Sequence, residues 1–251
     1  MLVKRDILRA LKSFHIQVIL LITILFSFLF TFFVGNGNKI GISIFGELTT
    51  YKDLSEVLLN GLNYTKGLGF LITFAITLFI AEEYQYNTWQ HYICSGRKRW
   101  EIYVGKYLFA NVLALIIFLI YILSSYFTSL IINKAISFDK IIFIISRGIM
   151  IYATLASLIV FLSMSFKNYI GGILASLVFV FFEKDIITSI LSIFKKLNID
   201  LEFLGKFTLM KINSLGPVAN INLLSEMIIP CILITVFSII LGSYCFSKFE
   251  L

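Results

Sequence analysis

The connector EEYQYNTWQHYICSGRKRW, residues 82–100, separates two apolar runs, GLGFLITFAITLFIA (67–81) and YVGKYLFANVLALIIFLIYIL (103–123). Both runs are apolar enough to enter a bilayer as helices. The connector contains two glutamates, a histidine, several aromatic residues and the basic cluster Arg97–Arg99. Aromatic and basic side chains gather where a chain leaves the hydrocarbon for the headgroups. The three segments together predict two membrane-spanning helices joined by a segment at the membrane surface.

The composition of the whole chain agrees with this interpretation. Of the 251 residues, 59% are hydrophobic and 14% are charged, and the mean hydropathy is +0.95. A soluble domain has about 25% charged residues. The apolar runs are longer than the alternating segments of about ten residues that build a membrane barrel. We therefore predict an all-α integral membrane protein.

We predict one transmembrane domain, residues 1–251, with six spans. The spans lie at about 14–34, 67–82, 103–132, 139–165, 169–187 and 227–247. The first residues, MLVKRDILRALKS, place apolar side chains on one helical face and basic ones on the other, which predicts an N-terminal interfacial helix. Segment 188–226 is too polar to span and too apolar for a free loop, so we expect short external helices there.

Basic residues set the predicted orientation. Lys4, Arg5, Arg9 and Lys12 precede the first span, and Arg97–Arg99 lies in the connector between spans two and three. Positive residues favour the cytoplasmic side, and the first helix usually dominates. Both termini and the connector are therefore predicted to be cytoplasmic. The net charge of +7 is explained by contact with membrane lipid, and the sequence has no nucleic-acid-binding motif.

The sequence lacks the patterns of a catalytic or metal site. Cys94, Cys231 and Cys245 have no metal-ligand spacing, and the phosphate-binding pattern G-x-x-x-x-G-K-[ST] does not occur. The chain has two histidines, His15 and His91. We expect no catalytic residues, cofactor, nucleotide or metal in this chain, and no enzymatic activity.

Within the connector, a surface helix is expected from about residue 83 to residue 94. Tyr and Trp side chains suit a helix at the interface, and Gly96 would end it. Such a helix could be a docking element for a cytosolic partner. An ordinary basic loop of the kind that sets membrane orientation is the alternative.

The order of residues here resembles the permease subunits of ABC-2 type transporters. In that family a Glu ends the second span, a Gly-Thr pair and a Gly- or Pro-x-Ser-Arg turn follow, and a Lys opens the third span. The positions that match are Glu83, Thr88, Gly96, Arg99 and Lys106, whereas Asn87 replaces the usual Gly and Lys98 the usual Ser.

The resemblance implies a function. Such a permease pairs with a second, identical or related permease, and each rests on a cytosolic ABC ATPase through the helix between spans two and three. The residues assigned in this way to ATPase docking are Glu83, Asn87, Thr88, Trp89, His91, Gly96, Arg97 and Arg99. The expected cargo is a hydrophobic or amphipathic peptide, such as a toxin, bacteriocin or antimicrobial peptide, and the expected location is a bacterial plasma membrane.

Two other interpretations and two structural hypotheses follow from the same residues. Arg147 within a span would suit a channel or secondary transporter independent of an ATPase, unless helix carbonyls satisfy it. Glu82-Glu83 is shared with intramembrane proteases, but Asn87 stands where their motif has Arg. Small residues over 171–176 are candidates for contact with a second permease, and segment 188–226 is a candidate gate at the outer mouth.

Overall fold

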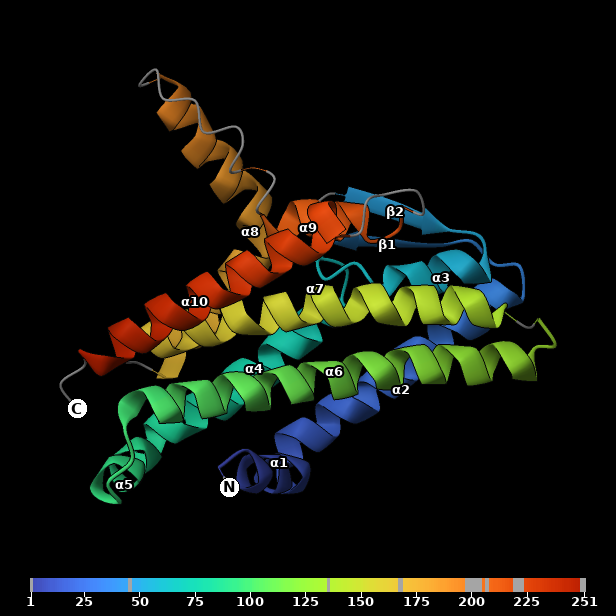
Figure 1. Ribbon diagram of the computed structural model, residues 1–251. Coiled ribbons are helices and arrows are strands. Elements are labelled where there is room, and N and C mark those ends of the chain that lie inside the picture. The colour runs from blue at the N-terminus through green and yellow to red at the C-terminus, as the bar shows by residue number, and fades with distance from the viewer. Residues whose placement is uncertain are drawn as a thin grey trace.

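The protein is a bundle of long helices that carries a small β-hairpin (Figure 1). The computed structural model describes residues 2–44, 47–134, 136–166, 169–196, 205, 208–218 and 224–248. Within these residues, five helices are long and apolar enough to cross a membrane. Four of them are α2 (Phe14–Gly35), α4 (Leu68–Gln85), α6 (Arg99–Ile131) and α7 (Phe138–Ser165). The fifth, Ser225–Ser247, is a continuous helix that consists of most of the π-helical turn η2 (Leu224–Ile228) and all of α10 (Ile229–Ser247). The all-α membrane class is therefore confirmed.

The predicted fifth span, 169–187, differs from the others. Its helix, α8, runs over Tyr169–Lys196, but the part apolar enough for a bilayer is Ile170–Glu183, which is shorter than a span. Glu183 and Asp185 interrupt the apolar run, and side chains beyond them are mostly exposed. The far part of α8 leaves the bundle (Figure 1). Six spans are thus not established for this chain.

Shorter elements lie at the two ends of the bundle. Helices α1 (Leu2–Lys12) and α5 (Thr88–Cys94) lie at the end where α10 finishes, which we call the α5 end (Figure 1). Strands β1 (Ile40–Ile44) and β2 (Glu47–Tyr51) and helix α3 (Leu54–Asn60) lie toward the opposite end, the hairpin end. Among the described residues of segment 188–226, α8 is followed by the short helix α9 (Leu209–Leu215) and by the start of η2. Of the apolar residues on which the predicted gate depends, Ile190 and Ile193 are exposed, against the expected burial, and Leu209 is buried. Leu197, Phe203, Leu204 and Phe207 lie outside the described residues.

The hairpin was not predicted, and one aromatic residue connects it to the helices. β1 and β2 pair antiparallel, with Ile40 opposite Tyr51. The buried Tyr51 donates a hydrogen bond of 2.6 Å to Asn60 Oδ1, and its ring centroid lies 5.0 Å from that of Phe30. Tyr51 thus ties the hairpin to α3 and α2.

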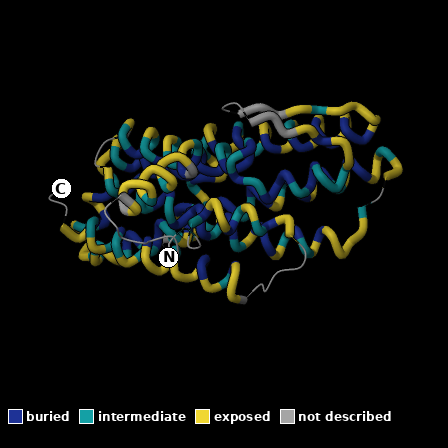
Figure 2. Tube along the Cα trace, turned by 90° about the horizontal axis from the view of Figure 1, so that it is seen from above, coloured by how far each residue is buried: buried dark blue, intermediate teal, exposed yellow. Residues whose placement is uncertain are grey.

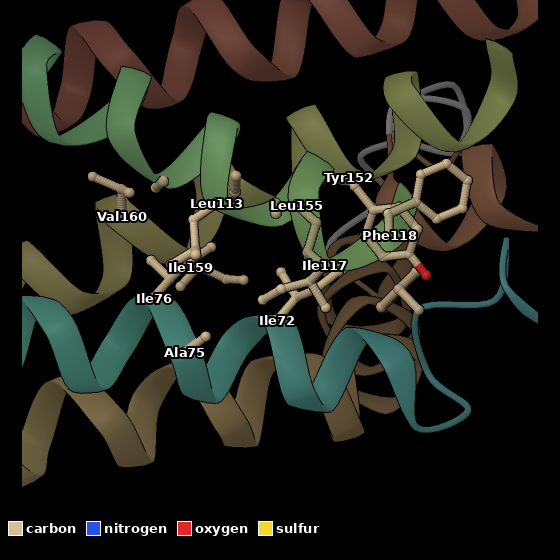
Figure 3. Close-up of a cluster of buried hydrophobic side chains, with 14 of the residues drawn as sticks. Ile72, Ala75, Ile76, Leu113, Ile117, Phe118, Tyr152, Leu155, Ile159 and Val160 are labelled. Atoms are coloured by element: carbon tan, nitrogen blue, oxygen red, sulfur yellow. The ribbon is translucent and has the colours of Figure 1, made fainter. Parts of the chain in front are cut away.

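The core lies where α4, α6 and α7 face one another (Figure 3). Branched aliphatic side chains from the three helices fill it: Ile72, Ile76, Leu113, Ile117, Leu155 and Ile159. A methyl group at Gly148 would lie 2.0 Å from Phe118 Cζ, so the glycine lets α7 approach the ring. Close contact of this kind is an important source of helix association in lipid, where water does not drive it.

The outward faces are apolar as well. Figure 2 shows buried residues inside the bundle and exposed ones outside, and α2 and α10 expose many large apolar side chains. A helix that is apolar all round is expected in a bilayer, because lipid tails solvate its outer face.

The small residues of α8 do not form a free stripe. Gly172 and Ser176 are buried against α7, where Ser176 Oγ lies 3.1 Å from Ser163 Oγ. A methyl group at Gly172 would lie 2.9 Å from the Ser163 carbonyl oxygen. These two positions pack within the chain, and contact of this helix with a second permease stays a prediction. Gly171 and Ala175 are half-buried.

Candidate functional site

Lys106 is the centre of a buried group of charges at the α5 end. Its side chain is 1% exposed and lies two turns into α6. Nζ donates hydrogen bonds of 2.5 Å to Asp6 Oδ2 and 2.6 Å to Glu83 Oε1. Arg9 donates a third bond, of 2.7 Å, to the same Glu83 oxygen. We call Asp6, Arg9, Glu83 and Lys106 the ion cluster.

The ion cluster is electrically balanced, with two carboxylates and two cations. Asp6, Glu83 and Lys106 are almost fully buried, whereas the Arg9 side chain is 37% exposed. Buried charges are costly unless they are paired and hydrogen-bonded. Because the partners come from α1, α4 and α6, the cluster holds the N-terminal helix against two long helices.

Aromatic rings complete the surroundings of Lys106. Nζ lies 5.3 Å from the ring centroid of Phe79 and 5.5 Å from those of Trp89 and Tyr92. The Arg9 guanidinium lies 4.1 Å from the centroid of Phe79. Cations are attracted to ring faces at these distances. The rings of Trp89 and Tyr92 bring α5 into the same unit as the ion cluster.

The backbone around α5 explains its position. Asn87, which precedes the helix, has φ +51°, a left-handed conformation that Asn tolerates better than most residues. The Thr88 hydroxyl donates to the Glu83 carbonyl oxygen at 3.2 Å, so α5 folds back against the last turn of α4. Gly96, with φ +81°, follows the helix end, as the sequence predicted.

Helix α5 has an inner and an outer face. Trp89 and Tyr92 point inward, and the Trp89 ring lies 5.4 Å from Phe246 of α10. Gln90, His91 and Cys94 are exposed on the outer face. The helix is therefore bound to the bundle by one face and open to a partner on the other.

The predicted docking residues divide into three groups. Asn87, His91 and Gly96 are exposed, and Thr88, Arg97 and Arg99 are half-buried, with Arg99 donating to the Ser247 carbonyl oxygen at 3.0 Å. Glu83 and Trp89 are buried in the bundle, so they cannot touch a partner directly. The helix is also shorter than the predicted 83–94, because α4 continues to Gln85 and includes Glu83.

Three members of the ion cluster were absent from the predicted docking set: Asp6, Arg9 and Lys106. Two sequence signals point to them. Asp6 interrupts the apolar face of an amphipathic helix, and Lys106 lies within an apolar run, where a charge requires a partner. Their pairing across 100 residues is not visible in either signal.

A second polar group lies away from the α5 end. The buried Glu183 of α8 accepts hydrogen bonds from the Tyr64 hydroxyl and, at 3.1 Å, from the Met210 backbone N–H of α9. Burial and the nearby Glu183 carboxylate raise the pKa of Tyr64 well above its usual range, so the phenol stays protonated and donates. Asn213 Oδ1 accepts from the Tyr64 backbone N–H at 3.2 Å. These contacts join α8, α9 and the segment before α4.

Arg147 belongs to this second group. Its guanidinium donates to the carbonyl oxygens of Leu215 at 2.9 Å and Gly216 at 3.1 Å, and also to that of Val218. These carbonyls lie at and beyond the C-terminus of α9, where helix acceptors lack intrahelical partners. Arg147 therefore has a structural role that explains a charge within α7.

The function of the site follows neither from a metal centre among the described residues nor from a similar protein of known function. Among the described residues, no group of three or more His, Cys, Asp or Glu side chains could hold a metal ion. No protein-family model, curated protein or solved structure matches the chain. The function is therefore inferred from the geometry of the chain and from the resemblance of its connector.

Proposed function

We propose that the chain is the permease subunit of an ATP-driven exporter of the ABC-2 type, and that α5 couples it to a cytosolic ATPase. One observation carries the proposal: α5 is bound to the bundle through Trp89 and Tyr92, next to the ion cluster, while its opposite face is exposed. A helix built in this way can receive a force on one face and pass it on from the other.

The route of coupling starts at the inner face of α5. Trp89 contacts Phe246 of α10, and Lys106 joins α6 to Glu83 of α4 and Asp6 of α1. A displacement of α5 would therefore act on α1, α4, α6 and α10 together. An ATPase that binds one arrangement of these helices better when ATP is present would shift the population toward it.

At Asn87 the sequence departs from the ABC-2 permease pattern, but the backbone conformation there supports the likeness. Asn87 stands where that family has Gly, and its φ of +51° lies in the region that glycine adopts readily. Asn is among the few other residues that enter this region. The substitution keeps the turn that leads into α5.

The cargo and the second permease belong to the same proposal. The interface of α4, α6 and α7 is filled by side chains (Figure 3), so a path for an amphipathic peptide is expected between two bundles instead of within one. Export of a hydrophobic peptide across a bacterial plasma membrane, with both termini cytoplasmic, fits a chain whose outer faces are apolar. The alternative of a channel or secondary transporter has less support, because Arg147 binds α9 carbonyls.

Cys94 provides a direct test in a Cys245→Ser background, because Cys94 is exposed on α5 whereas Cys231 is buried and Cys245 is half-buried. We expect an ABC ATPase to co-purify with the tagged chain. A membrane-impermeant maleimide should label Cys94 in inverted vesicles but not in intact cells, and the bound ATPase should slow labelling. As a control, Lys12→Cys on the exposed side of α1 should label from the same side with less protection. Labelling of Cys94 in intact cells would overturn the orientation, and purification of an active chain without an ATPase would overturn the function.

A further inference from the structure

A cavity of about 370 Å³ opens at the hairpin end, between α3 and the first turns of α7. Its apolar wall consists of Leu58, Leu59, Phe143 and Ile144. Volumes of this size are typical of sites for small molecules. An apolar cavity does not hold ordered water well, because water needs polar partners there.

The mouth of the cavity carries charges of both signs. Asp139 and Lys140 line it and are exposed, and neither side chain has a hydrogen-bond or ion-pair partner among the residues that the structure describes. Ser55 and Lys140 also border a second hollow that extends to Asp53 and Lys134. The Lys134 ammonium donates to the Gly35 carbonyl oxygen at 2.7 Å and adds a further positive charge at this rim.

The depth of these groups matches the layers of a bilayer. Asp139 and Lys140 lie in the first turn of α7, where charged side chains reach the headgroup region. Phe143 and Ile144 come one turn later, about 5.4 Å along the helix. In a bilayer that α7 spans, the cavity would be polar at headgroup level and apolar at the level where acyl chains begin.

We propose that this cavity binds one phospholipid with an amine in its headgroup. One acyl chain lies against Leu58, Leu59, Phe143 and Ile144, the phosphate faces Lys140, and the headgroup ammonium faces Asp139. Charge complementarity selects this ligand: a phospholipid such as phosphatidylglycerol would offer Asp139 no cation, and a lipid without a phosphate would leave Lys140 without a partner. The proposal requires only that the protein lies in a membrane, and it is independent of an ATPase.

The test uses the full-length chain, reconstituted into vesicles of phosphatidylethanolamine and phosphatidylglycerol in equal amounts. After extraction into a maltoside detergent, native mass spectrometry counts the lipids that remain bound. We expect one phosphatidylethanolamine per chain, retained several-fold more than phosphatidylglycerol. Ser55→Phe, which narrows the mouth, should abolish retention, and Lys140→Ala should reduce it several-fold.

Lys52→Ala is the matched control, because Lys52 is exposed near α3 but does not line the cavity. It should retain lipid as the wild type does. Asp139→Asn, a surface change that leaves the core untouched, should remove the preference for phosphatidylethanolamine even if Ser55→Phe fails to fold. Equal retention of both lipids by the wild type, or retention unchanged in Lys140→Ala and Asp139→Asn, would overturn the proposal.

Discussion

The two polar groups use buried charge in different ways. In the ion cluster, charges of opposite sign meet one another, and the partners Asp6, Glu83 and Lys106 come from three helices. In the second group, Arg147 and Glu183 meet mainly backbone groups of the segment around α9. The first arrangement holds long helices together, and the second satisfies the ends of a short helix. Removal of one charge should therefore destabilise the whole bundle at the α5 end, whereas in the second group it should loosen only the segment around α9.

The largest effect is expected for Lys106→Met. The substitution leaves Asp6 and Glu83 as buried carboxylates with only Arg9 nearby, and removal of one partner of a buried pair costs about 3–5 kcal/mol. Thermal unfolding of the purified chain in detergent should show a large fall in midpoint. Lys98→Met, at an exposed site, is the control. Adding Asp6→Asn to Lys106→Met leaves Arg9 paired with Glu83 and should restore most of the loss. Failure to do so would show that charge balance is not the cause.

Arg147→Met should have a smaller and more confined effect. It removes a charged donor from the carbonyls of Leu215 and Gly216, for which about 1.5–3 kcal/mol is typical. Hydrogen exchange should rise in 209–218 while α5 stays as protected as in the wild type. Lys211→Met, on the exposed side of α9, serves as the control. An equal rise of exchange in α5 would contradict the separation of the two groups.

Glu183→Gln should cost about 1 kcal/mol, because the amide oxygen keeps one of two acceptor functions. The Tyr64 hydroxyl and the Met210 N–H then compete for that oxygen. Exchange at Met210 is the measurement, with Asp185→Asn on the exposed part of α8 as the control. Unchanged exchange at Met210 would mean that the carboxylate does not stabilise the start of α9.

The smallest effect on stability is expected for His91→Ala, within about 0.5 kcal/mol, because the side chain is exposed. If the outer face of α5 is the docking surface, ATPase stimulation by the permease should nevertheless fall several-fold. Lys4→Ala, exposed on α1, is the control for a general change of surface charge. A stable His91→Ala protein with full coupling would remove His91 from the proposed interface.

The membrane class and most long helices could be predicted from the sequence, because long apolar runs suffice to indicate spans. The connector was also visible, since charge and aromatic rings stand out between two apolar runs. Helix ends were less predictable. Hydropathy placed the end of span two at residue 82, whereas backbone hydrogen bonding carries α4 through Gln85 and moves Glu83 into the bundle. Likewise, α8 continues well beyond 187 because a helix can persist after its apolar face ends.

The sequence by itself indicated a membrane protein and singled out the segment after the second span by its charge and aromatic rings. Both follow from local composition, which can be counted directly along the sequence. Only the tertiary structure decided that Lys106 meets Asp6 across 100 residues, that Trp89 points inward and His91 outward, and that Arg147 holds the end of α9. These contacts depend on how helices pack in three dimensions. Hydropathy records how much a segment prefers lipid, and it does not record which neighbour each face meets.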